Sequence, residues 1–237
     1  MKKLAFVFMD DFIHSSKQIL PFLPGYFDYS KWQVCVLKNW DSVCMTTAPD
    51  VIVNFRDAQF NWRQETDNFY ESDISCQIAQ FVLREGCGYV AVHAGTSMIP
   101  RDHPLRTQVL KGSAVSYKGN LMENLLADKG LPGASPFNAF ADVTFVPEGE
   151  HPILEGISEF TVRDEQYRVE LENGSDAVVL GRLVSDAAGS SIGAWASESG
   201  KGRAAGIALG HLSGSREHVM EQRLIANAIR WAGRAEP

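Results

Sequence analysis

Short apolar runs alternate with segments of helical periodicity through the first half of the chain. The apolar runs are Leu4–Met9, Gln33–Leu37, Val51–Phe55 and Tyr89–Val92, and the helical segments between and after them are Ser15–Leu23, Ile74–Arg84 and Leu105–Leu110. Strands that alternate with helices in this way build a parallel sheet covered by helices on both faces. The pattern therefore predicts an α/β fold around a mostly parallel sheet.

The second half of the chain is richer in strands. It predicts strands at Ala141–Val146, Phe160–Val169, Ala177–Leu183, Ile192–Ala196 and Arg203–Leu209. One short helix is expected near Leu121–Ala127, and an amphipathic helix is expected over Glu217–Ala232. The chain has 237 residues and is 45% hydrophobic, and one α/β domain of that size has ample core. We expect a single domain over residues 1–237, with the additional β-strands in its second half.

Charge and cysteine content narrow the class of protein. A formal net charge of −7 without basic runs argues against nucleic acid or an anionic membrane as partner. The first apolar run stops at Asp10, which favours a strand over a signal peptide, and no apolar stretch approaches the roughly 20 residues of a membrane span. The cysteines form no C-x-x-C pair, so buried reduced thiols are expected rather than a zinc ribbon. These features predict a cytoplasmic protein.

Polar residues follow several of the predicted strands. The first strand leads to Asp10, Asp11 and His14, and the third leads to Arg56 and Asp57. His93 follows the strand Tyr89–Val92, and His211 follows the strand Arg203–Leu209. Ligands of open parallel sheets bind beyond the carboxyl ends of the strands. We therefore expect three histidines, His14, His93 and His211, to converge on a site.

Two local patterns add candidate residues. A strand that turns sharply at His93 beside small residues has the form of a nucleophile elbow, but an imidazole there suits a general acid/base, an oxyanion partner or a metal ligand. In an extended segment Glu165 and Tyr167 share one face and Asp164 takes the other. Glu165 is a candidate to orient an imidazole. Trp195 either stacks on a sugar or belongs to the core.

Several short segments resemble, in their order and spacing, the ThuA-like (trehalose utilisation) family, a relative of the class I glutamine amidotransferases. These segments are Gly88-Tyr-Val-Ala-Val-His93-Ala-Gly, His151-Pro-Ile-Leu-Glu-Gly156, Asp164-Glu-Gln-Tyr167, Ala194-Trp195 with Gly200-Lys-Gly-Arg203, Gly210-His211 and Ile229-Arg-Trp231-Ala232. The resemblance covers most of the chain. It implies a flavodoxin-like, doubly wound domain and a role in the metabolism of trehalose, related disaccharides or their keto derivatives.

The resemblance also implies what the chain does not do. In amidotransferases a cysteine stands where His93 stands, and an acidic residue follows the catalytic histidine by two positions, where this chain has Ser213 after His211. Cys87 precedes the strand and cannot replace the nucleophile, so glutamine amidotransferase activity is not expected. Family members often have a histidine after the glycine-rich segment that follows the helix beginning at the elbow. The corresponding stretch of this chain, Gly112–Lys118, has no histidine.

Three functions remain open from the sequence. The first is a sugar or keto-sugar enzyme in which His93 and His211 act as acid and base, Glu165 orients one of them, and His14, Tyr167, Asp164 and Trp195 contact the sugar; no cofactor is required. The second adds zinc at His14, His93 and His211, with Glu165 as a further ligand, because these donors suit Zn²⁺. The third is a non-catalytic sugar-binding or regulatory module. The aromatic residues Phe60, Trp62, Phe69 and Tyr70 suggest either a homodimer interface or a lid.

Overall fold

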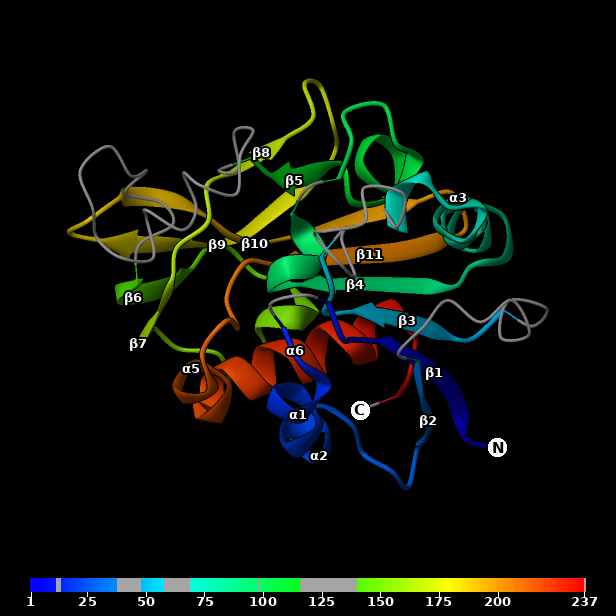
Figure 1. The fold of residues 1–237 in the computed structure, drawn as a ribbon, viewed down its shortest axis with the longest axis horizontal. Coiled ribbons are helices and arrows are strands. Elements are labelled where there is room, and N and C mark those ends of the chain that lie inside the picture. Colours follow the sequence, from blue (N-terminus) through cyan, green and yellow to red (C-terminus); the bar gives the residue numbers. More distant parts are fainter. Residues whose placement is uncertain (12–13, 38–47, 58–68, 98, 116–139, 237) are drawn as a thin grey trace.

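A computed structural model describes residues 1–11, 14–37, 48–57, 69–97, 99–115 and 140–236 (Figure 1). In this part of the chain nine strands form one sheet in the order β2-β1-β3-β4-β11-β10-β9-β6-β7. The parallel half of the sheet consists of β2 (Trp32–Leu37), β1 (Lys3–Phe8), β3 (Val51–Asn54), β4 (Gly88–Val92) and β11 (Gly202–Ile207). The antiparallel half consists of β10 (Gly189–Ser199), β9 (Val178–Ser185), β6 (Phe140–Pro147) and β7 (Phe160–Glu165).

The strands predicted in the second half of the chain thus extend the same sheet and make it mixed. β10 and β11 are joined by a tight turn at Gly200, whose φ of +59° suits glycine, and a hairpin can only pair antiparallel strands. The prediction of one continuous strand over Phe160–Val169 is wrong. The chain leaves the sheet after β7, where the Gln166 amide donates to the carbonyl oxygens of Leu183 and Gly189, both at 3.1 Å. It then forms β8 (Val169–Leu171), which pairs with β5 (Gly112–Ala114) in a separate two-stranded sheet.

Helices pack on both faces of the sheet (Figure 1). One face packs against α1 (Ser16–Ile19), the 3-10 turn Leu20–Phe22, α2 (Leu23–Tyr26) and α6 (Val219–Ala232), and the other against α3 (Asp73–Gln80) and the π-helical turns Phe81–Glu85 and Leu105–Leu110. Successive residues of β1 alternate between the two layers, so Val7 lies in the cluster that contains Leu224, whereas Phe8 lies in the cluster that contains Ile78. Two cores form because the strands of the parallel half place apolar side chains on both faces of the sheet.

Helix ends follow the sequence signals. Ser15 and Gln18 form a capping box at the start of α1, and Gly86 adopts a φ of +85° where the π-helical turn Phe81–Glu85 ends. The helix expected near residues 121–127 lies outside the described residues. Among the described helices none combines the length and the apolar character that a membrane crossing requires.

The aromatic residues that suggested an interface or a lid have a different role where the structure describes them. Phe69, in the 3-10 turn Phe69–Glu71, is 0% exposed, and Tyr70 is 3% exposed. Both belong to the core that contains α3, so these two side chains do not form the exposed aromatic surface that an interface would need. Phe60 and Trp62 lie outside the described residues, and a homodimer stays a prediction.

Candidate functional site

His93 occupies a strained turn directly after β4. Its φ of +48° is unusual for a residue other than glycine, and the chain continues into the 3-10 turn His93–Thr96. Gly95 is required in that turn, because an added Cβ would lie 2.1 Å from the carbonyl oxygen of Asn54. His93 Nδ1 lies 3.2 Å from the carbonyl oxygen of Ala208. A carbonyl only accepts, so Nδ1 has the proton and Nε2 is left as an acceptor.

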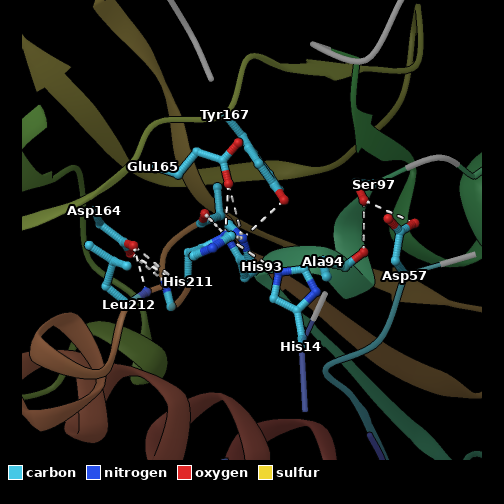
Figure 2. Close-up of polar contacts among 12 residues, drawn as sticks. His14, Asp57, His93, Ala94, Ser97, Asp164, Glu165, Tyr167, His211 and Leu212 are labelled. Carbon is cyan, nitrogen blue, oxygen red and sulfur yellow. Dashed lines mark hydrogen bonds and ion pairs between the residues drawn. The ribbon is translucent and has the colours of Figure 1, made fainter. Parts of the chain in front are cut away.

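His211 lies on the loop after β11, which we call the His211 loop (Gly210–Leu212). The carboxylate of Asp164, at the end of β7, accepts backbone N–H groups from Gly210 at 2.7 Å, His211 at 3.1 Å and Leu212 at 3.0 Å. Figure 2 shows the contacts of this carboxylate running to the backbone of His211 and Leu212. Asp164 therefore positions the loop with both carboxylate oxygens, and its contact with a sugar stays a prediction.

His14 reaches the same place from the segment after β1. Its Nδ1 lies 2.8 Å and 2.9 Å from the two carboxylate oxygens of Asp11, and its Nε2 lies 3.4 Å from His211 Nδ1. Burial raises the pKa of Asp11, but the hydrogen bond and the charge of His14 outweigh it and hold this pKa below its usual value. Sequence reasoning placed Asp11 at a strand end without assigning it this orienting role.

Glu165 and Tyr167 approach the imidazoles from the antiparallel half (Figure 2). Glu165 Oε2 lies 2.9 Å from His211 Nδ1 and 3.4 Å from His93 Nε2. The Tyr167 hydroxyl lies 3.0 Å from His93 Nε2, and the two rings stack with centroids 4.3 Å apart. The structure thus places both side chains on the same side, with Asp164 on the other.

The two central histidines have opposite electrostatic environments, although His93 Nε2 and His211 Nδ1 are only 2.9 Å apart. Burial, reinforced by the other imidazoles, lowers the pKa of His93 to about 4. Burial also acts to lower the pKa of His211, but the hydrogen bond to Glu165 and its charge outweigh burial and raise that pKa above its usual value. Burial would raise the pKa of Glu165, yet its contacts with His211 and, to a lesser degree, with His93 lower it to about 2. Burial thus favours the neutral form of His93, whereas Glu165 favours the charged form of His211.

The same atoms form a set of possible metal ligands. Among the described residues, His14, His93 and His211 each offer one nitrogen, and these atoms lie within 4.8 Å of one another. The remaining nitrogen of His14 faces a carboxylate and that of His93 faces a backbone carbonyl, which are the usual outer partners of metal-binding histidines. Glu165 Oε2 adds an oxygen donor beside them.

The remaining candidate, Trp195, lies in the core. It is 0% exposed, its indole N–H donates to the carbonyl oxygen of Leu110 at 2.9 Å, and an added Cβ on Gly206 would lie 2.2 Å from its ring. A fully enclosed ring has no surface for a sugar, so the core alternative holds.

The structure adds one feature that the sequence did not indicate. Ser97, two residues after Gly95, donates to the carbonyl oxygen of Ala94 at 2.9 Å and lies 3.5 Å from Asp57 Oδ1 (Figure 2). The Asp57 amide in turn donates to Asp11 at 2.7 Å. The segments after β1, β3 and β4 are thus tied together by side chains, and only the position of these residues at strand ends could have suggested it.

Comparison with known proteins gives a family and a fold. The sequence matches the family model described as "ThuA: Trehalose utilisation" over residues 29–232. A comparison with curated protein sequences found no match. Among solved structures, a ThuA-like protein from Parabacteroides merdae is similar with a TM-score of 0.68 at 13% identity, and the alignment covers 100% of this chain and 91% of that chain.

Two other solved structures share the fold. A β-galactosidase from Bacillus circulans sp. alkalophilus has a TM-score of 0.60 at 13% identity, with 98% of this chain covered but 31% of that longer chain. A protein from Salmonella typhimurium LT2 described as cytoplasmic has a TM-score of 0.59 at 13% identity, with 98% of this chain and 99% of that chain covered. At such identities the likeness shows a common mixed α/β fold and nothing of the chemistry.

Proposed function

The chain belongs to the ThuA family, and on that premise we propose that it is an enzyme of carbohydrate metabolism that moves protons on a keto derivative of trehalose or of a related disaccharide. The single observation that supports it best is the pair of histidines whose ring nitrogens lie 2.9 Å apart with Glu165 against both. Two titratable groups with pKa values pushed apart are the usual arrangement of an acid and a base.

His93 is the base in this proposal and His211 is the acid. A ring carbonyl acidifies the neighbouring C–H group, so His93 Nε2 takes that proton and the bonding electron pair moves onto the carbonyl oxygen. The imidazolium of His211 stabilises that oxygen, and Glu165 keeps His211 charged. Return of the proton to another carbon gives isomerisation, return to the other face gives epimerisation, and loss of a neighbouring oxygen group gives elimination. A placed acid or base contributes about 10²–10⁴-fold each.

Glutamine amidotransferase chemistry is not part of the proposal. His93 stands at the turn after β4, and Ser213 stands two residues after His211. Cys87 is buried before β4, donates to the carbonyl oxygen of Gly88 at 3.3 Å, and has a pKa that burial raises to about 12. At the turn after β4, where the structure is described, these observations support the absence of a thiolate nucleophile.

We also propose a layout for the fold and a location in the cell. The strand order β2-β1-β3-β4 with helices on both faces supports a flavodoxin-like, doubly wound layout for the parallel half. A cytoplasmic location has the support of the similar Salmonella typhimurium protein described as cytoplasmic.

The test is NMR in D₂O of the protein with trehalose, maltose and their 3-keto derivatives, with the variants His93→Ala and His211→Ala. His151→Ala is the matched control, because this partly exposed histidine packs against Trp231, far along the chain from the cluster. We expect deuterium at the carbon next to the carbonyl in the wild type and the control, and none in the other two variants. Exchange that persists in both site variants contradicts the proposal. Sugar binding without any exchange supports the non-catalytic module instead.

A zinc-dependent enzyme at the same site is the second candidate, favoured by the convergence of three nitrogens whose rings are held from outside. Bound zinc would polarise the sugar carbonyl as a Lewis acid. The distinguishing variant is His14→Ala. Without His14 the metal-free mechanism loses a sugar contact but keeps its acid and its base, and zinc has no effect on its turnover, whereas a zinc site loses a ligand.

The test of the zinc candidate is zinc binding by chelator-treated protein, measured by calorimetry and by elemental analysis. Stoichiometric binding that His14→Ala weakens, together with turnover that zinc restores, supports it. Full turnover in metal-stripped protein rejects it.

A further inference from the structure

A buried carboxyl group lies beneath the His211 loop. Glu221, in the first turn of α6, is 0% exposed. Its Oε2 accepts from the Ser215 hydroxyl, its Oε1 has no hydrogen-bond partner among the described residues, and an added Cβ on Gly210 would lie 3.2 Å from Oε1. The mechanism above does not use this group, although it borders the loop that holds the acid.

The His211 loop is also held by two charged side chains. Asp164 accepts its three successive N–H groups, and Arg216 Nε donates to the carbonyl oxygen of Gly210 at 2.7 Å. Arg216 Nη1 donates to the carbonyl oxygen of Gln18 at 3.1 Å, which ties the loop to α1. The loop therefore rests between groups from β7, α5 (Ser213–Glu217) and α6, and its conformation depends on their charges.

The surroundings of Glu221 favour its neutral form. The groups that face it are Asp164 from β7, Arg216 and Ser215 from α5, and the buried hydroxyl of Tyr26 from α2. Burial and the charge of Asp164 raise the pKa of Glu221 to about 8, against the opposing effects of Ser215 and Arg216. Near neutral pH the loop thus borders one carboxylate and one carboxylic acid.

We propose that Glu221 is a positioning residue for His211: its neutral carboxyl group supports the His211 loop, and release of its proton to solvent in alkaline solution displaces the loop and misplaces the imidazole. The inference deepens the proposed function and rests on it only for the role of His211 as the acid. Ionisation places a second negative charge in the low-dielectric interior beside Asp164, where like charges repel strongly. The loop backbone at Gly210 lies directly against Oε1 of Glu221, so the loop is the part expected to shift.

The direct test is a pH titration of the amide signals of Gly210, His211 and Leu212 by NMR, without substrate. We expect a common transition near pH 8 in the wild type. Glu221→Gln has a neutral side chain of the same shape, so it keeps the neutral-pH signals and lacks the transition near pH 8. The His211 imidazole titrates in both proteins, and its ring signals, followed in the same spectra, separate its transition from that of Glu221. Glu217→Gln, an exposed glutamate on α5, is the matched control and titrates like the wild type. An amide transition that differs from the ring titration of His211 and persists in Glu221→Gln, or the absence of such a transition from the wild type, overturns the proposal.

Unfolding experiments give a second readout. The folded protein holds the Glu221 proton between the usual pKa of 4.5 and about 8, whereas the unfolded chain has released it. Stability therefore falls as the pH rises through this window and levels off above it. The difference in urea midpoint between wild type and Glu221→Gln must show that slope. Ser215→Ala removes a hydrogen bond that favours the charged form, so it moves the transition to higher pH even where the Gln variant folds poorly.

Turnover separates this inference from the proposed function. If the keto-sugar reaction is observed, its alkaline decline follows the loop transition and disappears in Glu221→Gln. If the loop moves but turnover does not change with it, Glu221 does not position His211. If no sugar reacts, the NMR and unfolding results still decide the role of Glu221.

Discussion

The two halves of the sheet contribute different chemistry to the site. The parallel half supplies three imidazoles, each from the segment after a strand: His14 after β1, His93 after β4 and His211 after β11. The antiparallel half supplies the groups that set their charge and position, which come from β7 and the residues just after it: Asp164, Glu165 and Tyr167. Neither half holds a complete site.

This division matters for the charge of the imidazoles. His14 and His93 are buried and His211 is partly buried, and burial disfavours their charged forms. Glu165, 2.9 Å from His211 Nδ1, raises the pKa of that imidazole, whereas burial lowers the pKa of its neighbour His93. In the proposed mechanism the antiparallel half thereby separates the roles of acid and base. The predictions below remove its contributions in turn.

The largest effect is expected for Glu165→Gln. Glutamine keeps the shape but loses the charge, so the pKa of His211 falls and its charged, acidic form is less favoured. We expect turnover to fall by about 10²–10⁴-fold. Glu170→Gln is the matched control, because this glutamate on β8 is 45% exposed and pairs with Arg168. Kinetics with a keto-sugar and NMR titration of His211 measure both effects. Unchanged turnover would mean that the parallel half acts alone.

A large effect on stability is expected for Asp164→Ala. Three loop N–H groups lose their acceptor, and buried unsatisfied donors cost roughly 1–3 kcal/mol each before relaxation. Because the loop can relax toward water, we expect a net loss of about 3 kcal/mol. Asp142→Ala, at an exposed site on the neighbouring strand β6, should change little. Urea unfolding compares the two variants. Equal midpoints would show that Asp164 does not stabilise the His211 loop.

The parallel half was largely predictable from the sequence, and so were the imidazoles. Its strands are short apolar runs, and the turn at His93 follows from a strand ending against small residues. The alternation in Asp164-Glu165 also placed Glu165 on the side of the histidines. Local periodicity is enough for such features because neighbours along the chain determine them.

Long-range contacts were not predictable in the same way. Asp164 was expected to bind a sugar, but its partners lie 46 to 48 residues away on the His211 loop. The end of β7 depends on Gln166 reaching Leu183 and Gly189. Likewise, the burial of Trp195 depends on the close approach of Gly206 on the next strand. Sequence patterns show which face a residue takes, but not what covers that face.

A modest effect is expected for Tyr167→Phe. The ring stays stacked on His93, while the hydroxyl that lies 3.0 Å from His93 Nε2 is lost. A hydrogen bond to a neutral group contributes about 1 kcal/mol, so we expect turnover to fall less than about tenfold. Steady-state kinetics of Tyr167→Phe and Glu165→Gln, measured side by side, test this. A loss as large as that of Glu165→Gln would show that the phenol itself transfers a proton.

The smallest effect is expected for Glu148→Gln, at the far surface of the antiparallel half. Glu148 follows β6 and pairs with Arg182 of β9 at 2.9 Å, but the two side chains are 41% and 43% exposed. Exposed pairs contribute about 0–1 kcal/mol, because water screens the attraction and ordering two long side chains opposes it. We expect unchanged turnover and a urea midpoint close to that of the wild type. A marked loss of activity would mean that the whole antiparallel half, rather than its buried carboxylates, determines the charge of the imidazoles. Unchanged turnover in Glu148→Gln, compared with the loss in Glu165→Gln, would show that the side chains at the end of β7 determine the charge of the imidazoles.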